Sequence, residues 1–336
     1  MLKIGVLGVG HLGKIHLNCL SMIEGLYEVA GLYDPDDRHA SEAIARFGLR
    51  RFEDLDQFLD AVDVVDIVTP TVMHFSLAEK AMRKGKHLFI EKPVTQTVAQ
   101  AEELIRLQQE FGLAVQVGHV ERFNPALLSL GNLPVRPMFI EAHRLALFNP
   151  RGTDVSVVLD LMIHDLDIVL SMVDSEVTSI FASGVAVVSE TPDICNARLE
   201  FANGCVANLT ASRISLKQMR KLRLFQKDAY ISLDLLEKQA QVIRLFDHPD
   251  PSENHNGQLL ELPTANGTKW MTIEMPAIEQ TNAIKMELES FGQSILGKTP
   301  SKVPLEDGYE ALKLADRISR DMEERESRLK AMGIVR

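Results

Sequence analysis

The sequence predicts an α/β protein with two domains: an N-terminal doubly wound parallel sheet, then a C-terminal α+β domain with a large, mostly antiparallel sheet. In the first third of the chain, short β-branched runs alternate with helical stretches, which is typical of parallel βα units. Later β runs follow one another without intervening helices, which favours antiparallel pairing. A chain of 336 residues, 46% of them apolar, suits two cores better than one.

The first domain is expected over residues 1–119. Helices fill the gaps between its strands, and the helix at 99–110 ends before Gly112, a typical stop signal. The predicted strands are 3–7, 28–33, 64–68, 87–90 and 114–117.

The second domain is expected over residues 120–336. Residues 249–257 and 263–267 are polar and rich in turn-forming residues, so they are predicted to be loops. Two C-terminal helices, 283–296 and 305–329, carry apolar stripes and are able to pack back on the first domain. The other predicted elements are a helix at 157–172 and β runs at 178–188, 195–201, 205–214 and 221–233.

Composition narrows the range of functions. The formal net charge of -11 disfavours nucleic acid and anionic membranes as partners. No apolar run is long enough to span a bilayer, and Met1 leads almost directly into a strand, so we expect a cytoplasmic protein without a signal peptide. The cysteines Cys19, Cys195 and Cys205 lack paired metal-ligand spacing, which favours reduced thiols over disulfides or zinc.

A GxGxxG pattern at residues 8–13 follows the first predicted strand and precedes a helix, as in dinucleotide-binding loops. Gly8 allows a tight turn, Gly10 lets the backbone approach a pyrophosphate, and Gly13 lets the helix pack on the sheet. The N-terminal amides of that helix then face the phosphates. The residues expected to contact the cofactor here are Gly8, Gly10, His11, Leu12 and Gly13.

Asp34 ends the second predicted strand, about twenty residues after the glycine loop. A carboxylate there accepts hydrogen bonds from the adenosine ribose hydroxyls and repels a 2′-phosphate, so NAD is favoured over NADP. The alternative is that Asp34 caps the helix that follows Pro35.

Thr69-Pro70-Thr71 follows the third predicted strand and leads to His74. Because ligands of open parallel sheets lie at the carboxyl ends of the strands, this segment is expected to border the cofactor. We expect Thr69 and Pro70 to place backbone against the nicotinamide ribose. Thr71 or His74 would donate a hydrogen bond, and the alternative is that Thr71 caps a helix at 75–84.

Glu91-Lys92-Pro93 follows the apolar fourth strand and places a lysine at the same edge of the sheet. A lysine there can face the reacting end of a bound cofactor, whereas the alternative is a surface lysine in a turn. Pro93 stiffens the loop, and Glu91 is expected to position the loop or the lysine.

Asp160 and His164 form the second chemical cluster, on the predicted helix 157–172. Helix positions four apart share a face, so the aspartate can orient the imidazole and stabilise its protonated form. The alternative is an ion pair on a solvated face, but the neighbouring residues are mostly apolar. No further metal-ligand cluster accompanies the pair, and no metal is expected.

The glycine loop, Asp34, Thr69-Pro70 with His74, Glu91-Lys92-Pro93 and Asp160-x-x-x-His164, in this order, resemble the Gfo/Idh/MocA oxidoreductase family. The resemblance implies a Rossmann domain, a second domain whose open sheet face often serves oligomerisation, and reversible hydride transfer between a sugar or cyclitol hydroxyl carbon and NAD(P). It also implies that Lys92, His164 and Asp160 are the catalytic lysine, histidine and supporting aspartate. Either Lys92 or His164 is then the base, and the sequence leaves both open.

The segment 118–126 resembles the subgroup that oxidises the 3-hydroxyl of UDP-N-acetylglucosamine or related nucleotide amino sugars. Arg122 and Asn124 are candidate substrate-binding residues near the cleft, together with His164. Arg144 and Arg151 are candidates for pairing with the pyrophosphate of a nucleotide sugar. The alternative for Arg122 is a salt bridge that ties the two domains together.

Two rival functions stay open. Inositol or another monosaccharide would keep the catalytic residues and make the two arginines of the second domain dispensable. A non-catalytic NAD-sensing regulatory protein is the other rival, and retention of Lys92, Asp160 and His164 argues against it. A homodimer or homotetramer is expected, because the predicted helices leave one face of the second sheet to be covered.

Overall fold

The computed structural model describes residues 1–149, 155–248, 258–265 and 267–332. The chain forms two compact units. The first combines Met1–Phe123 with Thr281–Lys313, and the second combines Asn124–Gln280 with Leu314–Arg336. The predicted boundary after residue 119 therefore lies inside the first unit, which also includes a C-terminal segment.

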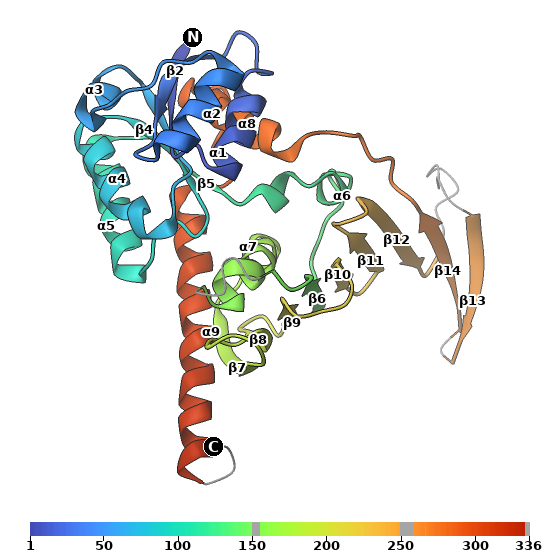
Figure 1. The fold of residues 1–336 in the computed structure, drawn as a ribbon. Helices are drawn as coiled ribbons and strands as arrows, with labels where there is room; N and C mark the ends of the chain where they lie inside the picture. Colours follow the sequence, from blue (N-terminus) through green and yellow to red (C-terminus); the bar gives the residue numbers. More distant parts are fainter. Residues whose placement is uncertain (150–154, 249–257, 266, 333–336) are drawn as a thin grey trace. The chain divides into compact units, whose positions relative to one another are not determined.

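The first unit is built on a five-stranded parallel sheet with the order β2-β1-β3-β4-β5. Figure 1 labels β2, β4 and β5 of this sheet, together with the helices of the unit. Beyond β2, Leu32 and Arg51 form an isolated parallel bridge. When the segment of Arg51 is counted as a strand, the order is that of a Rossmann sheet, which confirms the predicted doubly wound fold. The strands are β1 (Leu2–Leu7), β2 (Tyr27–Tyr33), β3 (Val64–Ile67), β4 (His87–Glu91) and β5 (Val115–Gly118).

Helices pack around this sheet, and their ends follow local signals. The last residue of α5 precedes Gly112, which adopts a left-handed conformation with φ 63°, so the predicted stop signal is confirmed. The helices are α1 (His11–Leu20), α2 (Asp37–Phe47), α3 (Leu55–Asp60), α4 (Thr71–Arg83), α5 (Val98–Phe111) and the 3-10 helix η1 (Val120–Phe123).

The C-terminal segment completes the core of the first unit with α8 (Ala283–Ile295). Tyr27 of β2 donates a hydrogen bond of 2.8 Å to the carbonyl of Leu288. Phe291 packs against Phe89 of β4, with 6.0 Å between the ring centroids. The predicted helix at 283–296 is therefore confirmed as an integral part of the Rossmann unit.

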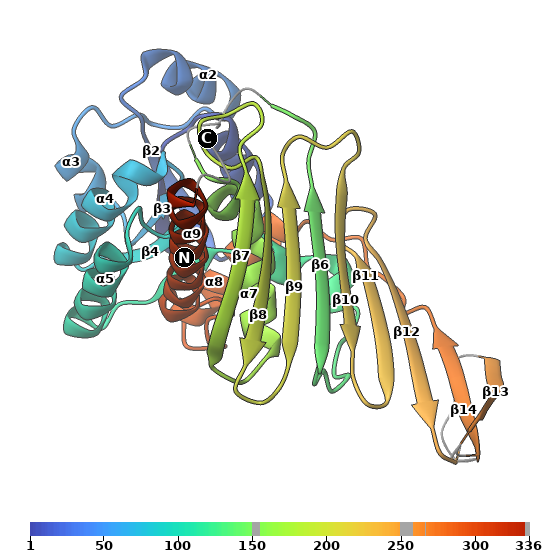
Figure 2. The same cartoon turned by 90° about the horizontal axis from the view of Figure 1, so that it is seen from below.

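The second unit is built on a nine-stranded sheet with the order β13-β14-β12-β11-β10-β6-β9-β8-β7 (Figure 2). All neighbouring pairs are antiparallel except β6 and β9, which confirms the mostly antiparallel prediction. The strands are β6 (Phe139–Leu145), β7 (Val177–Val185), β8 (Ile194–Phe201), β9 (Val206–Ser212), β10 (Met219–Phe225), β11 (Ala229–Asp234), β12 (Gln239–Phe246), β13 (Gln258–Thr264) and β14 (Gly267–Glu274).

One face of this sheet is covered by helix. Ile140 and Leu209 of the sheet form one buried cluster with Met162 and Leu166 of the helical segment. That segment comprises the π-helix η2 (Val158–Met162) and α7 (Ile163–Met172), and the short helix α6 (Pro125–Leu128) precedes the sheet. The helix α9 (Leu305–Ala331) crosses from one unit to the other at Lys313. Within the described residues, no helix is both long and apolar enough to cross a membrane.

The largest differences from the predicted elements lie in the second sheet. The strands β6, β12, β13 and β14 were not predicted. In the predicted loop at 263–267, residues 263 and 264 belong to β13 and Gly267 begins β14. The predicted loop at 249–257 lies outside the described residues. Strand β6 pairs with β9 and β10, which lie far along the chain, so local patterns do not reveal it. Strands β12, β13 and β14 pair mainly with strands that are near in the sequence.

Candidate active site

The glycine loop has the geometry of a phosphate-binding turn. Gly8 has φ 87°, a left-handed conformation that favours glycine, and a Cβ added to Gly13 would stand 2.0 Å from the carbonyl oxygen of Gly8. A Cβ at Gly10 would meet only His39, at 4.0 Å, so there is room above this residue. The helix α1 begins at His11, and no side chain caps its N-terminal amides. These amides are therefore available to a pyrophosphate, as NAD requires.

Asp34 lies directly after β2 and is buried beside the glycine loop. Its Oδ2 accepts a hydrogen bond from the amide of Val9 at 2.7 Å, and its Oδ1 accepts one from Asp36 at 2.8 Å. A carboxylate has capacity for further donors, so the ribose hydroxyls fit as additional partners. The capping alternative is wrong, because the N-cap of α2 is Asp36, which accepts hydrogen bonds from the amides of Arg38 and His39.

The segment after β3 is tied to the segment after β4 by His74. This side chain is 1% exposed, and its Nδ1 and Nε2 lie 2.9 Å from the carbonyl of Pro93 and 2.8 Å from that of Thr69. Both ring nitrogens are therefore occupied by backbone, which argues for a positioning role rather than the expected hydrogen bond to a cofactor. Thr71 is the first residue of α4, with Pro70 at the N-cap and no capping side chain, so the capping alternative for Thr71 is also wrong.

Lys92 follows the last residue of β4, at the edge of the sheet that carries the glycine loop. The Lys92-Pro93 peptide bond is cis. The amide of Lys92 donates to Oε2 of the preceding Glu91 at 3.2 Å. The backbone position of this lysine thus depends on a buried carboxylate.

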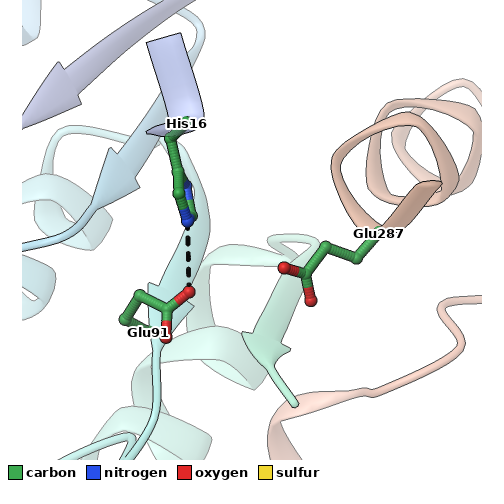
Figure 3. A group of neighbouring side chains, drawn as sticks. All are labelled: His16, Glu91 and Glu287. Carbon is green, nitrogen blue, oxygen red and sulfur yellow. Dashed lines mark ion pairs between the residues drawn. The ribbon is translucent and has the colours of Figure 1, made fainter. Parts of the chain in front are cut away.

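A polar cluster that was not predicted from the sequence lies at the C-terminal end of β4. His16 of α1, Glu91 of β4 and Glu287 of α8 each bring one potential ligand atom within 4.8 Å of the others, and all three are buried (Figure 3). The Nδ1 of His16 lies 3.0 Å from Oδ2 of Asp66, another fully buried residue. A histidine three residues after Gly13 and an aspartate inside an apolar strand were the available signals, because buried charges are rare unless they are paired.

In the second unit, Asp160 and His164 lie on consecutive helical segments. Asp160 is part of the π-helix η2, and His164 is in the first turn of α7. Both are half-buried, next to the buried residues Met162 and Ile163. This partial burial disfavours the alternative of an ion pair on a solvated face, but the π turn alters the α-helical spacing from which we expected a shared face. Turns of this kind are frequent at functional sites.

Arg144 is committed to an internal ion pair. Its Nε and Nη2 donate to the two carboxylate oxygens of Asp165, at 3.1 and 2.8 Å, and its exposed fraction is 3%. This bidentate pair joins β6 to the residue that follows His164. Its burial and its two bonds to Asp165 argue against the expected role of Arg144 at a pyrophosphate, which stays a prediction.

Arg122 and Asn124 also have partners within their own unit. Arg122 forms an ion pair with Asp307, and both belong to the first unit, so this pair does not join the two units as the alternative supposed. Asn124 caps α6 and donates to the carbonyl of Leu235 at 2.9 Å. Arg151 lies outside the described residues.

Comparison with known proteins identifies relatives across the whole chain. Residues 2–119 match the oxidoreductase family with an NAD-binding Rossmann fold, and residues 142–231 match the GFO/IDH/MocA C-terminal domain. UDP-N-acetylglucosamine 3-dehydrogenase of Acidithiobacillus ferrooxidans is 36% identical, over 89% of this chain and 90% of that one. The NAD-dependent scyllo-inositol 2-dehydrogenase of Bacillus subtilis is 28% identical, over 63% of this chain and 68% of that one.

Solved structures of oxidoreductases are also similar to this chain. A structure of the Acidithiobacillus ferrooxidans enzyme has a TM-score of 0.84 at 34% identity and covers 96% of this chain and 98% of that one. Levoglucosan dehydrogenase in complex with NADH and L-sorbose has a TM-score of 0.80 at 18% identity, covers 96% and 97% of the two chains, and shows the likeness of fold alone.

Proposed function

The chain belongs to the GFO/IDH/MocA oxidoreductase family, and on this premise we propose that it oxidises the 3-hydroxyl of UDP-N-acetylglucosamine or a related nucleotide amino sugar, with NAD as its cofactor. The observation that carries the proposal is the similarity to the Acidithiobacillus ferrooxidans enzyme over nearly the full length of both chains. The glycine loop and Asp34 have the room and the donors and acceptors that bound NAD needs.

When bound, NAD supplies the hydride acceptor. Loss of hydride from the carbinol carbon also requires removal of the hydroxyl proton, so a base must lie at that oxygen. We assign the proton transfer to the pair His164 and Lys92: one accepts the proton and the other donates a hydrogen bond to the developing oxyanion. The products are the ketone, the reduced cofactor and a proton held by the base.

Asp160 is assigned the supporting role beside His164. The first turn of α7, which carries His164, is fixed to the sheet by the Arg144–Asp165 pair. A fixed helix start holds the imidazole in one place, and this fixed position is needed for proton transfer at a substrate hydroxyl.

Inositol is the second candidate substrate. It is favoured by the similarity to scyllo-inositol 2-dehydrogenase and by the internal pairing of Arg144, which removes one expected pyrophosphate contact. The two candidates share the same catalytic groups, so they differ in substrate and not in chemistry.

The proposal is tested by incubating the pure protein with NAD and a panel of UDP-sugars, cyclitols and free monosaccharides. We expect the absorbance of NADH to rise with UDP-N-acetylglucosamine and a UDP-linked 3-keto sugar to be detected by mass spectrometry. Turnover of inositol with no response to any UDP-sugar would move the assignment to the second candidate. Tight NAD binding without turnover of any substrate would favour a regulatory protein.

We also propose that the chain forms a homo-oligomer through the face of the large sheet opposite α7. On that face Phe225 stacks near Phe139 and Tyr230, with ring centroids 5.9 and 4.9 Å apart, and Phe225 is 38% exposed. Exposed aromatic residues of this kind favour a protein partner. Light scattering coupled to gel filtration would reveal a single monomeric species if this proposal is wrong.

A further inference from the structure

A buried cluster of ionisable side chains lies directly behind Lys92. Figure 3 shows the imidazole of His16 and the carboxyl groups of Glu91 and Glu287 pointing toward one another from three different elements. The Nε2 of His16 lies 3.2 Å from Oε1 of Glu91. On its other side, His16 contacts Asp66. One imidazole is therefore placed between two carboxyl groups in the interior of the Rossmann unit.

The surroundings of each group in this cluster indicate which charged or neutral form is favoured. Burial alone would lower the pKa of His16, but Asp66 and Glu91 raise it well above the ordinary value, so the imidazolium form is favoured between these two carboxyl groups. Burial, followed by the charge of Glu91, raises the pKa of Glu287 well above its ordinary value. Within the described residues, neither oxygen of the Glu287 carboxyl group has a hydrogen-bond partner. A neutral Glu287 avoids the large cost of another unpaired charge in the interior.

Two neighbouring groups of the described residues, Cys19 and Tyr27, are not cations. The Cys19 thiol has its pKa raised by burial and interacts with His16 and Glu287. The hydroxyl of Tyr27 is committed to a backbone carbonyl of α8. Burial also raises the pKa of Asp66, and the His16 imidazole is the basic group that the described contacts place against Asp66 and Glu91.

The Glu91 carboxyl group also contacts the backbone at Lys92. Its Oε2 accepts the amide hydrogen of Lys92, and Glu91 is paired with Gly118 across β4 and β5. A Cβ added to Gly118 would stand 2.7 Å from Oε1 of Glu91, so the glycine makes the room that this carboxyl group occupies. Any displacement of the carboxyl group is transmitted directly to the peptide of the lysine.

We propose that Glu91 is a positioning residue for Lys92, and that His16, itself held by Asp66, fixes the Glu91 carboxyl group so that the helix of the glycine loop and the lysine form one rigid unit. The inference rests on the proposed function, in which Lys92 acts at the substrate hydroxyl. It assigns a role to α1 beyond phosphate binding, because His16 lies on the same helix as Gly13.

Two variants perturb the carboxyl group in different ways. Glu91→Gln keeps its shape and removes its charge, whereas Gly118→Ala keeps the charge and presses on Oε1. Glu289→Gln is the matched control, because Glu289 is an exposed residue on the same helix as Glu287. Thermal unfolding and NAD binding verify that each variant is folded.

The first readout does not depend on the substrate. Lysines are dimethylated with carbon-13, which retains their charge, and the signal of Lys92 is assigned by its loss in Lys92→Ala. In the NAD-bound protein, we expect Glu91→Gln and Gly118→Ala to shift this signal and its pH titration, and Glu289→Gln to leave both unchanged. An unshifted signal in both folded variants would refute the positioning role, even if the substrate is not the proposed one.

The second readout is a double-mutant cycle on turnover. Glu91→Gln is expected to lower kcat by about 10–100-fold with little change in the Kd of NAD, because small misplacements of a catalytic group cost rates of this order. In a Lys92→Ala background the same substitution should cost little, since it acts through that lysine. An equal loss in both backgrounds would mean a merely structural role.

A third measurement is the metal content of the purified protein. About one divalent cation per chain, lost in His16→Ala, would identify a metal centre and overturn the proposal. Absence of turnover on every substrate would reject the proposed function, and the NMR result would still decide the positioning role.

Discussion

Asp34 accepts a hydrogen bond from the backbone amide of Val9 through Oδ2, at 2.7 Å. This contact fixes a negative charge beside the glycine loop, at the position where a dinucleotide presents its adenosine ribose. The preference for NAD over NADP follows from that charge, because a 2′-phosphate would meet a carboxylate that cannot move away.

Asp34→Ala should therefore reduce the ratio of kcat/KM for NAD to that for NADP by about 10–100-fold, the loss expected for a hydrogen bond to a charged group. Steady-state kinetics with both cofactors measure this ratio. Asp36→Ala is the control: it removes the cap of α2 and should lower thermal stability without altering the ratio. An unchanged ratio in Asp34→Ala would contradict the assigned role.

Alanine substitutions at Gly13 and Gly10 should separate folding from cofactor binding. Gly13→Ala places a Cβ 2.0 Å from the carbonyl of Gly8, so we expect lower thermal stability and loss of NAD binding together. Gly10→Ala has room in the protein itself, with its nearest neighbour at 4.0 Å, and should retain stability while NAD affinity falls. Thermal unfolding and calorimetric titration with NAD test both. Unimpaired NAD binding by Gly10→Ala would place the pyrophosphate elsewhere.

Removal of Arg144 should destabilise the second unit strongly. Arg144→Met leaves Asp165 as a buried carboxylate without its bidentate partner, and the expected loss is about 3–5 kcal/mol in the free energy of unfolding. The half-exposed pair Arg198–Glu200 is the control, for which Arg198→Met should cost about 0–1 kcal/mol. Urea unfolding followed by circular dichroism compares the two. Equal midpoints would contradict the structural assignment of Arg144.

Glu287 should make the stability of the first unit depend on pH. Its folded pKa is raised by burial and by Glu91, so the unfolded chain releases this proton at lower pH than the folded protein does. The contribution of Glu287 to stability is thus fully present below its unfolded pKa and is lost as pH rises toward the folded pKa. Glu287→Gln should therefore flatten the decline in thermal midpoint above weakly acidic pH. Glu289→Gln should retain the wild-type slope, and a parallel slope in both variants would mean that Glu287 is ionised in the fold.

Lys92→Ala and His164→Ala should each lower kcat by about 10²–10⁴-fold, the usual contribution of a proton-transfer group, with NAD affinity intact. The base is identified by the variant that loses the acidic limb of the pH–rate profile, where the base becomes protonated. Turnover at the wild-type rate in either variant would remove that residue from the proposed chemistry.

The first sheet could be predicted closely because its signals are local. Strands β1, β3, β4 and β5 are short, largely buried runs, and β2 is partly buried. The glycine loop and Asp34 have fixed spacing along the chain. The second sheet was harder. Strand β6 buries Ile140, Ala142 and Arg144, and the arginine interrupts its alternating apolar pattern. It lies between β9 and β10 because it pairs with residues far along the chain.

The same difference applies to the site. Lys92 was located by its place at a strand end, which a local pattern reveals. The partner of Arg144 and the cluster of His16 with Glu287 depend on contacts between distant segments, so side-chain type alone suggested a ligand for Arg144 and gave no role to Glu287. The π turn at Asp160 could not be predicted either, because the expected spacing was that of an α-helix.

The central claim is most directly tested by following the hydride itself. The protein is incubated with NAD and UDP-N-acetylglucosamine that carries deuterium on the carbon of the 3-hydroxyl, with the sugar labelled at the neighbouring carbon as the control, and the reduced cofactor is analysed by mass spectrometry. The account predicts deuterated NADH from the first substrate and unlabelled NADH from the control. Unlabelled NADH from the first substrate, or no reduction of NAD by either, would contradict it.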